Sequence, residues 1–408
     1  MATARRTLVL GSLLVLLALA LGVVFGPTAF RVLQALRHHG PERARHELSR
    51  FEPPWQGPLV AYETATPDEQ GLSESQLAAW TARLADHRTQ HLLVVAGGKL
   101  AWEWRAPGRR ANDMVHVSAL TKGSAGTAAM AVAIDDGHVR LDDPASRWIP
   151  AWRDDPQRAG ITLRMLMDHT SGVQNVVYGG DGAGLVGWEK EFSDHHERRF
   201  PLTLTRAPLR FAPGSRVEYT SLAYYALSYA LTAALRDSDT PDLVTLLRER
   251  VHGPLGIPDA AFEMSYGRHE ELDGLRLYTV ASGAAYTPRA LARVGELFLS
   301  GSRRGVRIAR WRTLEDLLTP KDVPADRPAD EPPPACGWWS NRDRFFPSLP
   351  RDAVLAAGSN HRILLVVPSL DLVVVRLGSW LEPADARGGY WDGVDALLFA
   401  PLVAAVRG

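Results

Sequence analysis

The sequence predicts an α+β fold, in which an antiparallel sheet is flanked by helices and joined to a mainly helical subdomain. Two groups of strand-forming segments support this prediction, one at about 91–104 and the other at about 363–376. Between them, from about 118 to 275, the chain is helical and rich in loops. Strands separated by so long a segment imply one sheet whose members come from distant parts of the chain.

The N-terminus predicts a membrane helix ahead of this domain. No charged residue occurs from Thr7 to Phe30, and such a run can cross a bilayer as a helix. Arg5 and Arg6 precede the run, so the positive-inside rule keeps the N-terminus in the cytoplasm. We expect residues 1–30 to be a signal anchor in the bacterial cytoplasmic membrane, with the domain on the periplasmic side. A cleaved signal peptide, which would give a secreted protein, is the alternative.

The remaining chain divides into a tether and one large domain. Residues 31–64 are polar and interrupted by proline, which predicts the tether. Residues 65–400 form the expected domain, with a helical subdomain at about 118–275 and the sheet from about 65–117 and 276–400. The 46 basic residues balance the 46 acidic ones, so no basic surplus indicates nucleic-acid binding. The single cysteine, Cys336, excludes an internal disulfide.

The first elements of the domain have local signals. Ser73 and Gln76 have capping-box spacing at the start of a helix predicted over about 72–84. Two apolar segments then flank Gly97-Gly98, a pattern that is typical of a β-hairpin over 91–104.

The last elements are predicted in the same way. Strands over 363–367 and 372–376 flank a short turn, and an amphipathic helix follows over about 391–406. The proline-rich stretch Lys321–Ala335 predicts a surface loop or insertion.

Lys122 is the residue with the clearest chemical meaning. It lies at the start of a helix predicted to run to about Ile134. A lysine three residues after a serine shares its helix face, and a neutral lysine there can take the proton from the serine hydroxyl. Serine acyl-transfer enzymes use this Ser-x-x-Lys pattern. Here the nucleophile position is occupied by Ala119, and Ser118 lies one residue earlier. From its spacing alone, Lys122 could equally be a cation on the helix surface.

Several further segments carry a family resemblance. The run Val117–Pro150 closely resembles the serine β-lactamase-related and penicillin-binding-protein-like hydrolases, which include class C β-lactamases, carboxylesterases and 6-aminohexanoate-dimer hydrolases. The resemblance continues in order through 161–172, 213–219, 337–339 and 366–376 and covers roughly residues 65 to 400. It implies a β-lactamase/transpeptidase-like fold and an ester or amide acyl-transfer scaffold.

The resemblance also implies two motifs besides Ser-x-x-Lys. The Tyr-x-Asn motif of the family reads Tyr219-Thr220-Ser221, so the proton-shuttling tyrosine matches and Ser221 replaces the asparagine. Tyr219 could instead only pack at the start of the apolar helix that follows. The Lys-Thr-Gly or His-x-Gly motif, whose glycine lets substrate lie against a strand edge, aligns with Ala356-Ala357-Gly358. A slip of this alignment would make His361 the polar contact, although His361 could also be a structural histidine.

Two other histidine-containing segments are interpreted without a catalytic role. His169-Thr170-Ser171-Gly172 matches a structural turn of the family and lacks the Gly-x-Ser-x-Gly elbow of a nucleophile. His195-His196-Glu197 stands without a second set of ligands, so no metal site is expected. We expect no cofactor.

Three polar positions of the family therefore differ here, namely Ala119, Ser221 and Ala356. Their combination predicts a serine hydrolase-like protein with impaired catalysis, because loss of the nucleophile removes most of the rate. One alternative is an active hydrolase that uses Ser118, activated by Lys122 and Tyr219. Another is a non-catalytic periplasmic binding protein that uses the same cleft, and a third is that Ala119 was introduced into an active enzyme.

The expected partners are few. One is a small-molecule ester, amide or peptide-like ligand, and the other is the inner membrane, reached through the N-terminal helix. No nucleic acid is expected, and the sequence leaves the oligomeric state open.

Overall fold

The computed structural model describes residues 55–176, 185–303, 305–381 and 389–407. The predicted anchor, 1–30, and most of the predicted tether lie outside these residues. Within them, no helix is both long enough and apolar enough to cross a membrane.

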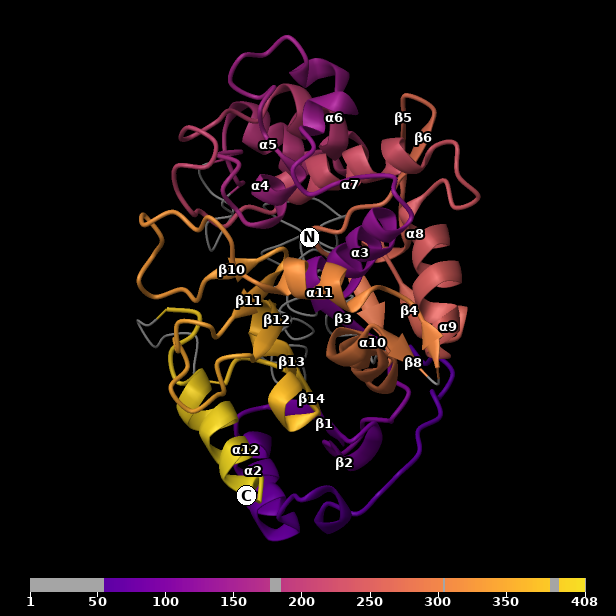
Figure 1. The fold of residues 1–408 in the computed structure, drawn as a ribbon, viewed down its shortest axis with the longest axis vertical. Helices are drawn as coiled ribbons and strands as arrows, with labels where there is room; N and C mark the ends of the chain where they lie inside the picture. Colours follow the sequence, from indigo (N-terminus) through magenta and orange to yellow (C-terminus); the bar gives the residue numbers. More distant parts are fainter. Residues whose placement is uncertain (1–54, 177–184, 304, 382–388, 408) are drawn as a thin grey trace, which may run out of the picture. The chain divides into compact units, whose positions relative to one another are not determined.

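A seven-stranded antiparallel sheet joins the two ends of the described chain (Figure 1). The strands, in their order across the sheet, are β10 (Pro334–Ala335), β11 (Trp338–Ser340), β12 (Val354–Gly358), β13 (Arg362–Val367), β14 (Leu372–Gly378), β1 (Thr89–Ala96) and β2 (Lys99–Arg105). The early hairpin β1–β2 pairs with β14, and Val94 lies opposite Val374. The predicted sheet from distant segments is confirmed, because both strands carry long apolar runs that are stable only when paired and covered.

Helices cover both faces of this sheet. On one face, α2 (Glu74–Asp86) packs with the C-terminal helices η11 (Asp395–Phe399) and α12 (Ala400–Ala405). On the other face lie α3 (Ala128–Asp135) and α10 (Pro288–Ser300). Successive side chains of a strand point to opposite faces, so Val94 joins the first core and Val95 the second. The last helix was predicted as one element, and its first turns are π-helical.

The helical part gathers on the second of these cores, with α4–α7 grouped together in Figure 1. Its helices are η2 (Lys122–Thr127), α4 (Leu163–Met167), α5 (Gly187–Asp194), α6 (Arg199–Thr205), α7 (Leu222–Leu235), α8 (Leu243–Leu246), η6 (Leu247–His252), α9 (Gly253–Leu255) and α11 (Trp311–Leu318). Helical single turns are η1 (Asp68–Gln70), η3 (Ala145–Arg147), η4 (Pro150–Trp152), η5 (His196–Arg198), η7 (Asp259–Ala261), η8 (Ser265–Gly267), η9 (Ser359–His361) and η10 (Pro368–Leu370). Helix α7 is the centre of this part, because nearly all its residues are buried.

Two features differ from the sequence expectation. A three-stranded sheet of β3 (Val115–Ser118), β7 (Ala284–Tyr286) and β4 (Phe262–Glu263) lies beside the helices, and two hairpins join β5 (Glu270–Leu272) to β6 (Leu275–Leu277) and β8 (Ser302–Arg303) to β9 (Val306–Arg307). These strands are too short for a periodic signal. Residues 56–64, assigned to the tether, instead pack on the domain: Gly57 N donates to Asn112 O at 3.0 Å, and Val60 is buried.

Candidate active site

The chain makes a tight turn between β3 and η2, where the Ser-x-x-Lys pattern was expected. Ser118 ends β3 with φ +54°, in the left-handed region, and Lys122 N donates to Ala119 O at 3.0 Å. The helix begins only at about Thr121. Ser118 therefore precedes the helix and does not share a helical face with Lys122.

The Lys122 side chain is buried and fully engaged. It is 2% exposed. Its Nζ donates to Tyr219 Oη at 2.7 Å, to Ser221 Oγ at 3.2 Å and to Ala281 O at 2.7 Å. Lys122 is therefore not a cation on the helix surface. Its amine joins the start of helix η2 to the Tyr219-Thr220-Ser221 segment before α7.

His169 supports the loop that carries Tyr219. The two rings lie with centroids 4.6 Å apart, and Thr220 N donates to His169 Nδ1 at 3.2 Å. Burial, with a smaller contribution from Lys122, lowers the pKa of His169 to about 3, so the imidazole is neutral at pH 7. The turn that contains His169 thus fixes the position of Tyr219.

Asn175 is a site residue that the sequence did not identify. Ser221 N donates to Asn175 Oδ1 at 3.1 Å, so an amide lies beside the hydroxyl that replaces the family's asparagine. Asn175 follows the turn at Gly172, which has φ +77° and whose Cβ would lie 2.3 Å from Phe211 O. Only glycine fits this crowded turn, so Gly172 is the residue from which the sequence could have indicated that the chain turns back toward the site here.

The sheet side of the site is held together by close packing. A Cβ on Gly358 would lie 2.1 Å from Val117 O and 3.2 Å from Ala119 N, so a glycine is required where β12 meets the turn. Ala356 is fully buried, and a Cβ on Gly123 would lie 2.6 Å from Ala356 Cβ. Ala356 therefore packs against the helix start, and the structure gives it no polar or ligand-facing role.

His361 is a structural histidine, so its assignment as a substrate contact is corrected. It is 3% exposed, Leu381 N donates to its Nδ1 at 3.0 Å, and its Nε2 lies 2.6 Å from Tyr390 O. Since Nδ1 accepts, Nε2 carries the proton and donates it to that carbonyl. Both ring nitrogens are thus occupied by the main chain. Burial lowers the pKa of His361 to about 4.

Arg362, the next residue, is a second group that the sequence did not identify. Its Nη1 donates to Ser118 Oγ at 2.8 Å, directly beside Ala119. Tyr390 Oη donates to Gly358 O at 2.7 Å on the same side of the site. The Ser118 hydroxyl is therefore bonded to a guanidinium of the sheet and is absent from the three contacts of Lys122 Nζ.

No metal-binding arrangement of three or more suitable side chains occurs among the described residues. In the segment His195-His196-Glu197, the His195 Nδ1 atom lies 3.1 Å from Glu197 Oε1, and both side chains are exposed.

The arrangement presents hydroxyl donors to a ligand. A charged lysine has three N–H groups, and the three oxygen contacts of Lys122 use all of them. The hydroxyl oxygens of Tyr219 and Ser221 accept these bonds, so their own protons remain for another acceptor. A carbonyl or carboxylate oxygen is such an acceptor. Ala119, which stands where the Ser-x-x-Lys pattern has its serine, carries only a methyl group.

Known proteins share this fold. The solved structure of a 6-aminohexanoate-dimer hydrolase candidate from Bacillus anthracis superimposes with a TM-score of 0.61 at 17% identity, covering 86% of this chain and 90% of that one. A penicillin-binding protein homologue from Caulobacter crescentus gives a TM-score of 0.56 at 14% identity, covering 76% and 93%. The fold is thus β-lactamase/transpeptidase-like, as the resemblance implied.

Curated relatives match over part of their length. D-alanyl-D-alanine-carboxypeptidase/endopeptidase AmpH of Escherichia coli is 32% identical over 45% of this chain and 44% of that protein. Esterase EstB of Burkholderia gladioli is 30% identical over 48% and 49%. The chain thus spans about half the length of these relatives. The family model for Beta-lactamase matches residues 77–397. By this match, with a buried lysine and a half-buried tyrosine at the expected motifs, the chain belongs to the Beta-lactamase family of serine hydrolase-like proteins.

Proposed function

We propose that this chain is a catalytically impaired member of its family that binds an ester, amide or peptide-like ligand in the cleft. The observation that carries the proposal is the pairing of Ala119, which has no nucleophilic atom, with a Lys122 whose Nζ is bonded to Tyr219 and Ser221. The binding groups of the site are present, and the group that would form an acyl-enzyme is absent.

The names of the relatives support the ligand class. AmpH is named a carboxypeptidase/endopeptidase and EstB an esterase. Both names describe carbonyl substrates, and the Tyr219 and Ser221 hydroxyls offer hydrogen-bond donors to a carbonyl oxygen. Asn175 adds a side-chain amide next to Ser221, which suits the polar backbone of a peptide or amide.

An active hydrolase that uses Ser118 is the less favoured alternative. The Ser118 hydroxyl accepts a bond from Arg362, and Lys122 Nζ has its three contacts elsewhere. A general base must lie within hydrogen-bond reach of the proton that it removes. Use of Ser118 would therefore require both contacts to break and the turn to rearrange.

Intact-protein mass spectrometry tests the proposal. The full chain, Ala119→Ser and Ser118→Gly are each incubated with a p-nitrophenyl ester and with a β-lactam. We expect no adduct on the parent and a covalent adduct on Ala119→Ser. Glycine is the matched change at 118 because it accepts the positive φ. An adduct on the parent that disappears in Ser118→Gly would establish the active hydrolase instead.

Ligand binding is tested separately by the thermal stability of Ala119→Ser and of the parent. The unreactive ligand is a peptide that ends in D-alanine amide, and we expect it to raise the melting temperature of the parent. Lys122→Met is the matched loss-of-site variant, checked first for a cooperative melting transition. Equal stabilisation of the parent and Lys122→Met would contradict binding at this cleft.

We also propose that the domain lies on the periplasmic side of the cytoplasmic membrane, anchored by residues 1–30. The uncharged run Thr7–Phe30 and the preceding Arg5 and Arg6 support this. Membrane fractions of cells that express the full chain should contain it. Protease added to spheroplasts should degrade the domain. Recovery of a shortened chain in the soluble periplasmic fraction would favour the cleaved signal peptide.

A further inference from the structure

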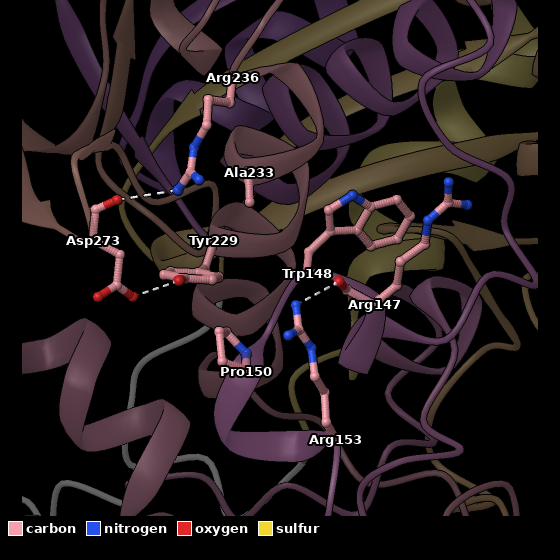
Figure 2. A pocket seen from close by; sticks show the side chains of 8 residues that line it. All are labelled: Arg147, Trp148, Pro150, Arg153, Tyr229, Ala233, Arg236 and Asp273. Carbon is pink, nitrogen blue, oxygen red and sulfur yellow. Dashed lines mark hydrogen bonds between the residues drawn. The ribbon is translucent and has the colours of Figure 1, made fainter.

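A pocket of about 300 Å³ lies in the helical part of the molecule, outside the cleft (Figure 2). Its wall contains three arginines, one carboxylate and two aromatic rings, which belong to Arg147, Arg153, Arg236, Asp273, Trp148 and Tyr229. None of these residues has a role in the proposed function.

Helix α7 separates the pocket from the cleft. Ser221, which contacts Lys122, immediately precedes the first residue of α7, whereas Arg236 immediately follows the last. At a rise of 1.5 Å per residue, these two positions are roughly 20 Å apart along the helix axis. The pocket is therefore a second site and not an extension of the first.

The carboxylate of the pocket is already engaged. Tyr229 Oη donates to Asp273 Oδ2 at 2.5 Å, as Figure 2 shows. Burial, with the hydrogen bond to Asp273, raises the pKa of Tyr229, so the phenol remains protonated. Arg236 does not pair with this carboxylate, because its Nη2 donates to the main-chain oxygen of Asp273 at 3.0 Å.

The other two guanidinium groups are also poorly neutralised. Arg153 donates to two main-chain oxygens, Ser146 O at 3.4 Å and Arg147 O at 3.3 Å. The Arg147 guanidinium lies 5.2 Å from the centre of the Trp148 ring, and its nearest carboxylate oxygen, Asp143 Oδ2, is 3.9 Å away. Carbonyl oxygens carry no net charge, so the three cations of the wall outnumber its one carboxylate.

We propose that this pocket binds a phosphate group. Guanidinium groups match phosphate oxygens with paired N–H donors. Each guanidinium has five donors, of which Arg153 uses two and Arg236 one in the hydrogen bonds described above. A phosphate dianion offsets the excess of two positive charges in the wall, whereas one carboxylate would offset half of it. The phosphate can belong to a soluble phosphate monoester or to the headgroup of a lipid monoester such as phosphatidic acid, which present the same dianion to the arginines.

Calorimetric titration of the full chain with inorganic phosphate at low salt tests the site. We expect Arg153→Gln/Arg236→Gln to bind phosphate about tenfold or more weakly than the parent, because each charge-assisted hydrogen bond contributes strongly. Arg83→Gln, which removes an exposed arginine of α2, is the matched control and should bind as the parent does. Rising ionic strength should weaken binding to the parent.

Two outcomes would overturn the proposal. One is equal phosphate affinity in the parent and the double variant, with both showing the same melting temperature. The other is no heat of binding in the parent. Glycerol phosphate and dihexanoylphosphatidic acid, which are both phosphate monoesters, then identify the source of the phosphate. Equal affinity for the two supports a soluble ester, and tighter binding of the lipid supports a headgroup.

Discussion

The two sides of the candidate site, one formed by helices and the other by the sheet, are held by different interactions. On the helical side, Lys122, Tyr219 and Ser221 are joined by hydrogen bonds to one buried amine. On the sheet side, Gly358 and Ala356 lie so close to the turn and the helix start that a Cβ on Gly358 or on Gly123 would not fit. The first side depends on polar atoms and the second on the absence of side-chain volume.

This difference has opposite consequences for Ala356 and Lys122. Alanine at 356 fills the space beside Gly123 without any polar contact, so the packing there requires no polar group. Lys122 is different, because a buried ammonium without oxygen partners is strongly destabilising. Retention of Tyr219 therefore follows from the stability of the fold as well as from ligand binding.

The largest effect is expected when volume is added on the sheet side. Gly358→Ala places a Cβ against Val117 O, a main-chain atom that cannot move aside. We expect a loss of about 3 kcal/mol in the free energy of unfolding, measured by urea denaturation. Gly160→Ala is the control, since nothing lies within 4 Å of a Cβ there. Equal stability of the two variants would show that the close packing is not required.

A smaller effect is expected when a polar atom is removed from the helical side. Tyr219→Phe leaves Lys122 short of an acceptor and should lower the free energy of unfolding by about 2 kcal/mol, as for bonds to charged groups. Tyr390→Phe is the matched change on the sheet side. It removes a bond to the neutral Gly358 O and should cost about 1 kcal/mol. A larger cost for Tyr390→Phe would reverse the comparison.

A further effect is absent at neutral pH and appears only on acidification. The pKa of His169 on the helical side is lowered to about 3, and that of His361 on the sheet side to about 4. Unfolded histidine takes up its proton near pH 6.5, earlier than either folded residue. Stability should therefore fall as the pH drops below about 6.5, and continue to fall to about pH 3 for His169 but only to about pH 4 for His361.

Melting temperatures between pH 7 and pH 3 measure this effect. Replacing either histidine by asparagine should flatten the profile over its own window. The His361 variant should match the parent in slope below pH 4, where both forms of that residue are protonated. If the profile of the His169 variant ran parallel to that of the parent, His169 would take up its proton at the same pH in the folded and the unfolded protein, and its pKa would not be lowered by folding.

The sequence predicted those features that have a local or repeated signal. The hairpin over 91–104, the strands over 363–376 and the helix after Lys122 all contain apolar runs, and the structure contains each of them. The meeting of Lys122 with Tyr219 followed from the family resemblance. The position of Ser118 at the end of β3 could not be predicted, because its positive φ has no counterpart in residue spacing.

The remaining site residues depend on tertiary contacts. Asn175 reaches Ser221 through a turn that only the folded chain brings back to the cleft. Arg362 was hidden because it meets Ser118 across separate strands. His361 has a side chain suited to binding, and only its burial between two main-chain groups shows that it is structural.

The pairing of β1 with β14 has a consequence for how the protein folds. These strands come from opposite ends of the domain, and Ser73 N also donates to Ala405 O at 2.8 Å. During synthesis, the apolar edge of β1 that pairs with β14 therefore stays unpaired until nearly the whole domain has left the ribosome. Closing so long a loop is slow, and an open edge invites pairing with other chains. We expect the newly made chain to depend on chaperones until its last strand is available.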